Sequence, residues 1–321
     1  MPKLVSVTRI LNEDDIAEAF IRHNARHVGH MLFLDNGSTD RTLEILHALQ
    51  AEGFPLSVVR THSISFDEIS LNSWGYQAAS QLFGADWVVF IDADEFIATQ
   101  DSAPLATLLP ADEPAITVQL VNYSQTELDD PSELIVPLRL RHRWAGETNV
   151  DKLILRAGLQ GVSIGAGNHC ALLRGGRVLP ARRHDLVSFA HYPRRSGWQI
   201  LQKMAAGWLK ALAAGRPAAD ARHSEHYRSP FETMRDKPGE LFRNSGYFTR
   251  EFGLDQAIEA PLDYLGGGLR YTQPADPAMK AAQMFLSFTE RLAVQHGRLL
   301  DESPQARALV EAWNAKRDFL F

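Results

Sequence analysis

The chain of 321 residues contains one cysteine, Cys170, and has no long apolar run. A single cysteine excludes an intrachain disulfide and a cysteine-based zinc finger, and it fits a reducing compartment. No apolar run is long enough to cross a bilayer, and the N-terminal one is too short for a signal peptide. We therefore expect a cytoplasmic protein without a transmembrane segment. The formal net charge of −6 argues against a nucleic-acid-binding protein.

Apolar residues make up 45% of the chain, an ordinary share for a globular protein. In the first third, strand-like and helix-like patterns alternate. Strands are predicted at 4–8, 31–34, 56–59 and 87–91, and helices at 14–23 and 68–82, with a further helix carrying Leu43, Leu46 and Leu49. This alternation predicts an α/β fold with a mostly parallel sheet and helices on both faces.

The rest of the chain is less regular. Further strands are predicted at 115–120, 151–156 and 186–190, and a polar stretch at 122–147 could form an insertion or a lid. Ser196 is a suitable cap for the next helix, and residues 277–300 and 304–316 have helical patterns. We predict a first domain at 1–195 and a mainly helical extension at 196–321.

The most informative segment is residues 87–96, in which an apolar run ends in Asp92, Asp94 and Glu95. The carboxyl end of a buried strand is where an open α/β sheet places its ligand site. Crowded carboxylates repel one another, and a divalent cation that bridges to a phosphate relieves this cost. The segment therefore predicts a metal–diphosphate site; the alternative is an acidic turn at the end of a strand.

Four motifs follow one another along the chain: Asn12-Glu13, Asp35-Asn36-Gly37-Ser38, Asp92-Ala93-Asp94-Glu95-Phe96, and His191-Tyr192-Pro193-Arg194-Arg195-Ser196. In this order they resemble glycosyltransferase family 2 of the GT-A fold, in a variant that looks like a bacterial subgroup whose members also carry the His-Tyr-Pro element. The resemblance implies a metal-dependent, inverting glycosyltransferase. Its donor would be a UDP- or GDP-sugar, its cofactor Mn²⁺ or Mg²⁺, and its acceptor a glycan or a small molecule. Its GT-A nucleotide-sugar-binding and catalytic domain would be 1–195, and the helical extension at 196–321 would lie on the acceptor side or serve in packing.

The same resemblance assigns roles by position. Asp94 would bind the metal directly, and Asp92 would contact the ribose or the metal. Family members often carry two aspartates where this chain has Asp35-Asn36, so the base contact of Asn36 differs from the common pattern. The residues expected on the donor are Thr8, Asn12, Glu13, Asp35, Asn36, Asp92, Lys152, Arg194 and Arg195.

His191 follows the apolar strand at 186–190, and Arg194 and Arg195 come shortly after it. A neutral imidazole can complete a manganese shell, and an arginine can bind phosphate oxygens bidentately. We therefore predict His191 as a third metal ligand, beside Asp92 and Asp94. The alternative is a hydrogen-bonded core histidine.

An inverting transfer needs a base that takes the proton of the acceptor hydroxyl. No motif fixes this residue. Asp151 and Glu147 precede a predicted strand and rank first, and Glu95 adjoins the metal motif. Asp185, which precedes another strand, also stays open.

Other signals point to different classes of protein. The segment 161–165 matches Gly-x-Ser-x-Gly, but no helix start follows it, as a hydrolase nucleophile would require. His223 and His226 lie one turn apart without a recognisable third zinc ligand. A nucleotide-sugar-binding or interaction protein that lacks catalysis remains the alternative function.

Overall fold

The computed structural model describes residues 1–61, 68–146, 150–214, 225–237, 256–274 and 277–314. Four parallel strands form one side of the sheet, in the order β3-β2-β1-β4, with β3 at its edge. They are β1 (Leu4–Ile10), β2 (His30–Asp35), β3 (Leu56–Arg60) and β4 (Trp87–Phe90). These strands confirm the predicted parallel arrangement of the first third.

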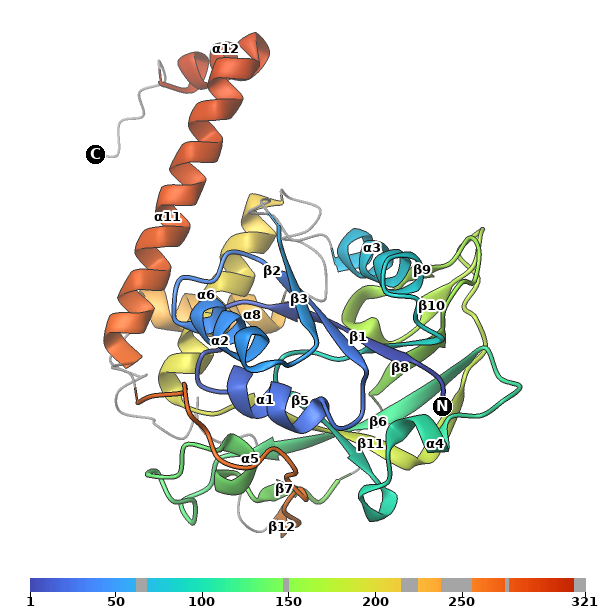
Figure 1. Ribbon diagram of the computed structural model, residues 1–321. Coiled ribbons are helices and arrows are strands. Elements are labelled where there is room, and N and C mark those ends of the chain that lie inside the picture. Colours follow the sequence, from blue (N-terminus) through green and yellow to red (C-terminus); the bar gives the residue numbers. More distant parts are fainter. Residues whose placement is uncertain (62–67, 147–149, 215–224, 238–255, 275–276, 315–321) are drawn as a thin grey trace.

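A mixed half extends this sheet beyond β4 (Figure 1). β8 runs antiparallel to β4 and β6, and β11 pairs in parallel with β6 and antiparallel with β5. The strands of this half are β5 (Glu95–Thr99), β6 (Ala115–Ser124), β7 (His142–Trp144), β8 (Asp151–Arg156), β11 (Arg182–Arg194) and β12 (Ala257–Glu259). The predicted insertion thus adds β7 to the sheet, beside β6 and β12.

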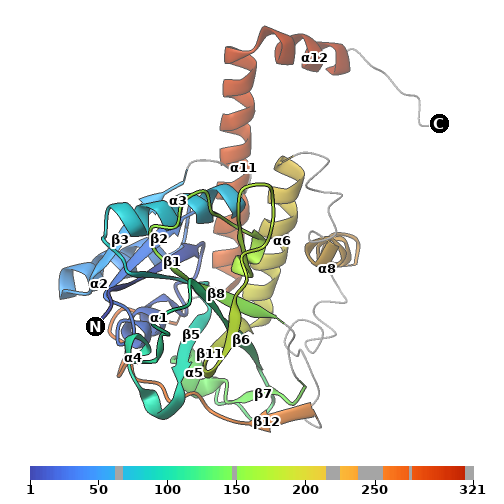
Figure 2. The ribbon, with the colours of Figure 1, turned by 90° about the vertical axis from the view of Figure 1, so that its right-hand side faces the viewer.

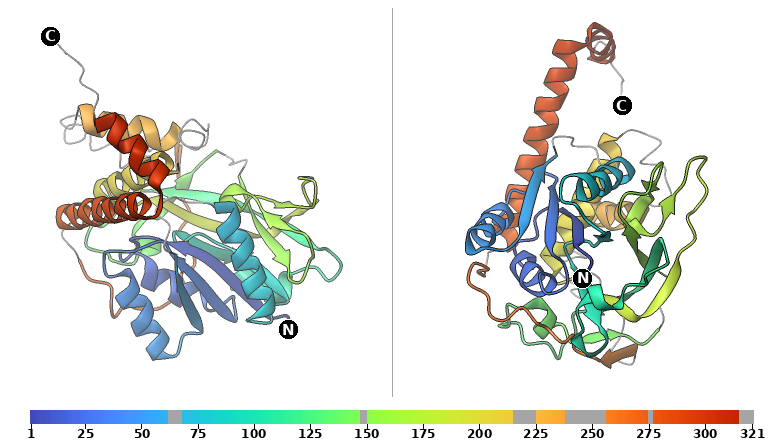
Figure 3. Two further views of the ribbon diagram at one scale, coloured as in Figure 1. Left: turned by 90° about the horizontal axis from the view of Figure 1, so that it is seen from above. Right: turned by 45° about the vertical axis from the view of Figure 1, so that its right-hand side comes forward.

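Helices cover both faces of the parallel strands, as predicted (Figure 3). Because side chains alternate along a strand, Met31 and Phe33 pack toward α1 (Ala17–Asn24) and α2 (Thr42–Glu52). Leu32 and Leu34 pack on the other face, toward α3 (Glu68–Gln81).

Two glycines fix this packing. A Cβ on Gly75 of α3 would lie 2.5 Å from Cγ1 of Val7, so glycine is what lets the helix approach β1. Gly53 ends α2 with φ +105°, a left-handed conformation that favours glycine.

Short elements connect the main ones: η1 (Gln100–Ser102), α4 (Leu105–Leu108), α5 (Val136–Arg139), β9 (Ser163–Ile164), η2 (Ala166–Asn168) and β10 (Ala171–Leu172). The 3₁₀ turn η2, and not an α-helix, follows Ser163, so the nucleophile-elbow geometry is absent there.

The last described part of the chain is mainly helical, with α6 (Gly197–Ala213), α8 (Glu225–Asp236), α11 (Pro277–Glu302) and α12 (Pro304–Asn314). Ala205 and Ala206 of α6 pack with Met284 of α11. Figure 2 shows α11 projecting beyond the sheet, with α12 at its far end. Among the described helices, none combines the length and the apolar character that a bilayer span requires.

Candidate active site

The candidate site lies at the carboxyl ends of β1 and β4. The strand order reverses between these neighbours, since β2 and β3 follow on one side of β1 and β4 lies on the other. Such a switch point is where open α/β sheets bind ligands. A cavity of about 300 Å³ opens here, and the polar side chains that line it are Arg9, Asn12, Glu13, Asn36, Glu68, Asp92, Asp94, His191, Gln199, Gln202, Lys203, Lys210 and Tyr227.

Asp94 and His191 face each other in this cavity. β11 pairs with β5 so that His191 lies opposite Glu95, which delivers the imidazole to the metal motif. Nε2 of His191 is 3.6 Å from Oδ1 of Asp94, and Nδ1 donates to Oδ1 of Asn122 at 2.7 Å. A proton on Nδ1 leaves Nε2 as a lone-pair donor pointing at a carboxylate. This pair of atoms fits a divalent cation, and the second hydrogen bond of the imidazole is the one that metal-binding histidines commonly make.

Within the described residues, one group of three possible ligands has its ligand atoms within 4.8 Å of one another: Asp94, Glu95 and His191. Glu95 is fully buried and does not line the cavity. Its carboxylate accepts from the backbone N–H of Asp92 at 2.9 Å and pairs with Lys152 at 2.9 Å. Glu95 therefore lies behind the site, and Asp94 and His191 are the two members that face the cavity.

Asp92 also lines the cavity, but the protein's own cations hold it. Nζ of Lys152 lies 2.5 Å from one carboxylate oxygen and Arg9 lies 3.0 Å from the other. Burial would raise the pKa of Asp92, and Lys152 and Arg9 instead hold it below its usual range. Lys152, which is 2% exposed, neutralises the carboxylates of Asp92 and Glu95 and does not line the cavity.

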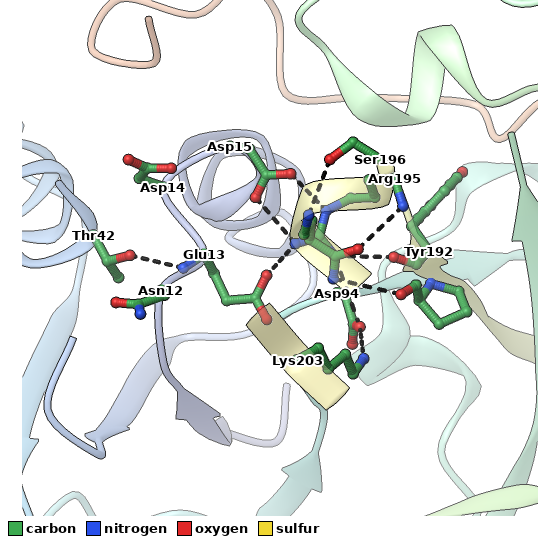
Figure 4. A network of polar contacts seen from close by, with 12 residues as sticks. Asn12, Glu13, Asp14, Asp15, Thr42, Asp94, Tyr192, Arg195, Ser196 and Lys203 are labelled. Atoms are coloured by element: carbon green, nitrogen blue, oxygen red, sulfur yellow. Dashed lines mark hydrogen bonds and ion pairs between the residues drawn. The ribbon is translucent and has the colours of Figure 1, made fainter. Parts of the chain in front are cut away.

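Lys203 of α6 supplies a further cation to Asp94, with Nζ 2.8 Å from Oδ2 (Figure 4). Burial would raise the pKa of Asp94, but the cations of Lys203 and Arg195 hold it well below its usual range. Asp94 is therefore ionised at neutral pH, as a metal ligand must be.

Arg195 connects three loops of the site, as Figure 4 shows. It is 1% exposed. Its guanidinium donates to Asp15 at 2.8 and 3.0 Å, to Glu13, and to the backbone oxygen of Tyr192 at 3.0 Å. Since these donors point at the protein and Arg195 does not line the cavity, it positions the loop after β1. Arg194, on the end of β11 opposite Ser124, does not line the cavity either.

The loop after β1 is attached to the loop after β2. Asn12 adopts φ +56°, and its side-chain oxygen accepts from the backbone N–H of Thr39 at 2.7 Å. The N–H of Glu13 donates to Oγ1 of Thr42 at 2.8 Å. Burial raises the pKa of Glu13 to about 7, against the opposing effect of Arg195. Asn12 and Glu13 both line the cavity, whereas Thr8 is fully buried and does not.

Asp35 and Asn36 differ in what they contact. The buried carboxylate of Asp35 accepts from the N–H groups of Gly37 and Ser38 at 3.1 and 2.9 Å, so it shapes its own turn. Asn36 lines the cavity. Its amide nitrogen donates to Thr61 at 2.8 Å, and its oxygen accepts from Lys210 of α6.

None of the candidate bases among the described residues lines this cavity. Asp151 accepts two hydrogen bonds from Arg183, at 2.9 and 2.6 Å, and one from Thr117 at 3.2 Å, and it does not line the cavity. Glu147 lies outside the described residues, as does His223 of the histidine pair. Asp185 lines a second cavity, on the far side of Asn122.

Three cations of the cavity wall escaped the sequence reasoning: Arg9, Lys203 and Lys210. Lys203 and Lys210 lie seven residues apart, two turns of α6, and therefore share one helix face. Burial, together with Arg291 and Arg9, lowers the pKa of Lys210 to about 7. The predicted cap of α6 is confirmed, since Oγ of Ser196 accepts from the N–H of Gln199 at 3.2 Å. The seven-residue spacing of Lys203 and Lys210 in the helix after this cap was the sequence feature that could have predicted their shared face.

The central sheet order, the carboxylates after β4 and the cavity at the switch point define an α/β enzyme of the GT-A type that uses a nucleotide-linked sugar. Residues 11–173 match the family described as Glycosyl transferase family 2. The chain belongs to this family and is a glycosyltransferase, which confirms the expected fold, family and enzyme class.

Two solved structures show more distant likenesses. One is TarS 1–349 from S. aureus, with 14% identity, a TM-score of 0.39, and coverage of 79% of this chain and 76% of that one. Another is glucosyl-3-phosphoglycerate synthase from Mycobacterium tuberculosis in complex with Mn²⁺, UDP and glucosyl-3-phosphoglycerate. That match has 24% identity and a TM-score of 0.27, and it covers 38% of this chain and 44% of the other. No curated protein matches the sequence.

Proposed function

We propose that this glycosyltransferase is metal-dependent and inverting, and that it moves a sugar from a UDP- or GDP-sugar to a hydroxyl of a glycan or small-molecule acceptor. The observation that carries the proposal is the facing pair of His191 Nε2 and Asp94 Oδ1, 3.6 Å apart. One is a lone-pair donor fixed by Asn122, and the other is an ionised carboxylate. A divalent cation is the partner that suits both.

Asp94 and His191 would hold Mn²⁺ or Mg²⁺, and Asp92 stays a candidate for the metal or the ribose. When bound, the metal would neutralise negative charge on the departing diphosphate. Arg9, Lys203 and Lys210 line the same cavity and would bind phosphate oxygens. They take the place that the sequence reasoning gave to Lys152, Arg194 and Arg195, whose side chains do not line it.

Inversion requires a single displacement. The acceptor oxygen attacks the anomeric carbon from the face opposite the diphosphate, the bond to the diphosphate breaks, and a base takes the acceptor proton. Asp151, Glu147 and Glu95 stay predictions for this base. The burial of Glu95 and the bidentate contact of Asp151 with Arg183 both disfavour access to an acceptor.

We also propose that the extension at 196–321 completes the donor site, because α6 contributes Lys203 and Lys210 to its wall. From the sequence we expect this extension on the acceptor side or in a packing role; for α6 we propose the donor side instead. Membership in the bacterial subgroup is supported by the His191–Ser196 motif, whose histidine faces Asp94 and whose serine caps α6.

The test is a thermal-shift screen of UDP and GDP with and without Mn²⁺, followed by hydrolysis assays with the corresponding sugar nucleotides. Ligands that bind the folded state raise its melting temperature by mass action. We expect one nucleotide to stabilise the protein more with Mn²⁺ than without, and this gain to vanish in His191→Ala. An equal rise in melting temperature with and without Mn²⁺ would overturn the metal assignment. Binding without any turnover would favour the non-catalytic alternative.

A further inference from the structure

A second cavity, of about 510 Å³, lies beside the first. Asn122 lines the second cavity and His191 lines the first. Nδ1 of His191 donates to Oδ1 of Asn122 at 2.7 Å. At this point the two cavities are therefore separated only by these two hydrogen-bonded side chains. A molecule in the second cavity would therefore lie next to the proposed metal ligand.

An irregularity in strand pairing makes this space. β11 pairs with β6 at Arg183 opposite Thr117, and again at Ser188 opposite Gln119. Four residues of β11, 184–187, thus stand against one residue of β6, so the register between these two strands shifts here. Bulges of this kind are common next to active sites, where they redirect side chains. β7, with Arg143 and Trp144, supplies the opposite wall.

The lining combines an aromatic ring with two arginines, amides and one carboxylate, that of Asp185. Trp144 is 37% exposed, and a Cβ on Gly146 would lie 2.5 Å from its ring, so the backbone passes directly over the indole. Arg143 donates to the backbone oxygen of Trp144 at 3.3 Å. No carboxylate of the described residues comes within ion-pair distance of Arg143. Arg183, in contrast, pairs with Asp151.

These groups match one class of ligand. An aromatic ring offers a flat apolar surface with a polar edge, which suits the C–H face of a sugar ring. The amides of Gln119 and Asn122 can exchange hydrogen bonds with hydroxyl groups. The guanidinium of Arg143 suits a carboxylate or phosphate, which it can bind bidentately.

We propose that this second cavity is the acceptor site, and that the acceptor is a saccharide carrying an anionic group. The inference rests on the proposed transferase function and deepens it. Trp144 stacks on the sugar ring and Arg143 pairs with the anion. Asn122 binds a hydroxyl while it orients His191. This arrangement brings the acceptor beside the donor site, through the contact of Asn122 with His191, without placing it among the carboxylates of the first cavity.

The test uses glucuronate and glucose as probes, with saturation-transfer NMR on the full chain. We expect glucuronate to receive more saturation than glucose. Trp144→Ala should abolish transfer to both probes, and Trp144→Phe, which keeps an aromatic face, should retain it. Arg143→Gln should remove the preference for glucuronate. The matched controls are Trp74→Ala, a 42% exposed tryptophan on α3, and Arg182→Gln on β11, which should behave as the wild type.

Equal transfer to the two probes in the wild type would overturn the anionic acceptor. No transfer to either probe, or an unaltered signal in a folded Trp144→Ala, would overturn the cavity assignment. UDP and GDP binding, measured on the same samples, separates the two proposals. Lost glucuronate binding with intact nucleotide binding contradicts the acceptor site alone. The reverse result contradicts the transferase proposal.

Discussion

At the scale of single residues, the site is a set of buried or partly buried carboxylates that each have a cationic partner. Asp94 faces Lys203, Asp92 faces Arg9, and Glu95 faces Lys152. An unpaired buried charge costs several kcal/mol, so pairing is required before any ligand binds. Asp94 differs from Asp92 and Glu95, because one of its oxygens lies 3.6 Å from Nε2 of His191 in the cavity. This difference makes Asp94 the proposed direct metal ligand.

The first prediction concerns Asp94→Asn. The amide keeps the shape of the side chain and loses its charge, so Mn²⁺ should no longer raise the melting temperature, and most sugar-nucleotide turnover should be lost. Asp101→Asn, an exposed aspartate of η1, should leave both readouts at the wild-type level. A normal Mn²⁺ shift in Asp94→Asn would contradict the assignment.

The second prediction concerns Lys210, whose pKa burial lowers to about 7. Contact with a phosphate would raise this pKa, so nucleotide binding should take up a proton near pH 7 and above. Affinity should therefore be highest below pH 7 and should fall as the pH rises through 7 toward the pKa of the bound state.

Calorimetry in two buffers of different ionisation enthalpy measures this proton uptake. Lys210→Arg is the matched control, because a guanidinium stays charged throughout the range. It should bind nucleotide without the pH dependence. Proton uptake that persists unchanged in Lys210→Arg would show that another group titrates.

The sequence located the residues at strand ends but not those on α6. Asp94 and His191 each follow an apolar run, and the end of a strand is visible in sequence. The helical pattern of α6 shows which residues pack inward, but not which loop its polar face covers. For Arg195 the sequence pattern and the structure point to different partners. Its position shortly after His191 suggested contact with phosphate, whereas its buried guanidinium pairs with Glu13 and Asp15, which lie on a loop distant in sequence.

At the scale of elements, strand direction was the main surprise. The parallel strands were predicted, because alternating strands and helices allow few other arrangements. β8 was found at its predicted bounds, 151–156, yet it runs antiparallel to β4. Direction depends on where the preceding loop crosses the sheet, which the apolar pattern does not encode. β11 is longer than its predicted core at 186–190, since Arg182 and Arg183 pair with β6 without an apolar pattern.

The third prediction concerns the cap of α6. Ser196→Ala removes the hydrogen bond from the N–H of Gln199 and should cost about 1 kcal/mol of stability. Because α6 carries Lys203 and Lys210, nucleotide affinity should fall as well. Ser196→Asp, which can also cap, should restore both properties.

Ser303→Ala is the matched control for this cap. Oγ of Ser303 accepts from the N–H of Ala306 at the start of α12, also at 3.2 Å, and α12 lies at the end of α11 that projects away from the sheet (Figure 2). Its loss should lower the free energy of unfolding without changing nucleotide affinity. Equal effects of both variants on affinity would show that the cap acts only through global stability.

At the scale of the whole molecule, Arg195 joins the two halves of the chain. It precedes the cap of α6 and binds the loop after β1, and its Nη1 lies 3.8 Å from Asp94. A boundary between 195 and 196 therefore cuts through the site rather than between independent units. Burial would raise the pKa of Asp15, and the Arg195 guanidinium holds it below its usual range. This contribution to stability is present above the unfolded pKa and is lost as the pH falls through the folded one.

The last prediction follows from that contact. Arg195→Gln leaves Asp15 and Glu13, which are partly buried, without their cation, so it should cost about 1–3 kcal/mol of unfolding free energy near neutral pH. The deficit should shrink as the pH falls, because protonated carboxyls no longer need a cation. Arg182→Gln, at an exposed position of β11, should cost much less. Denaturant unfolding at several pH values measures both, and a deficit that does not change with pH would contradict the charge-pairing role.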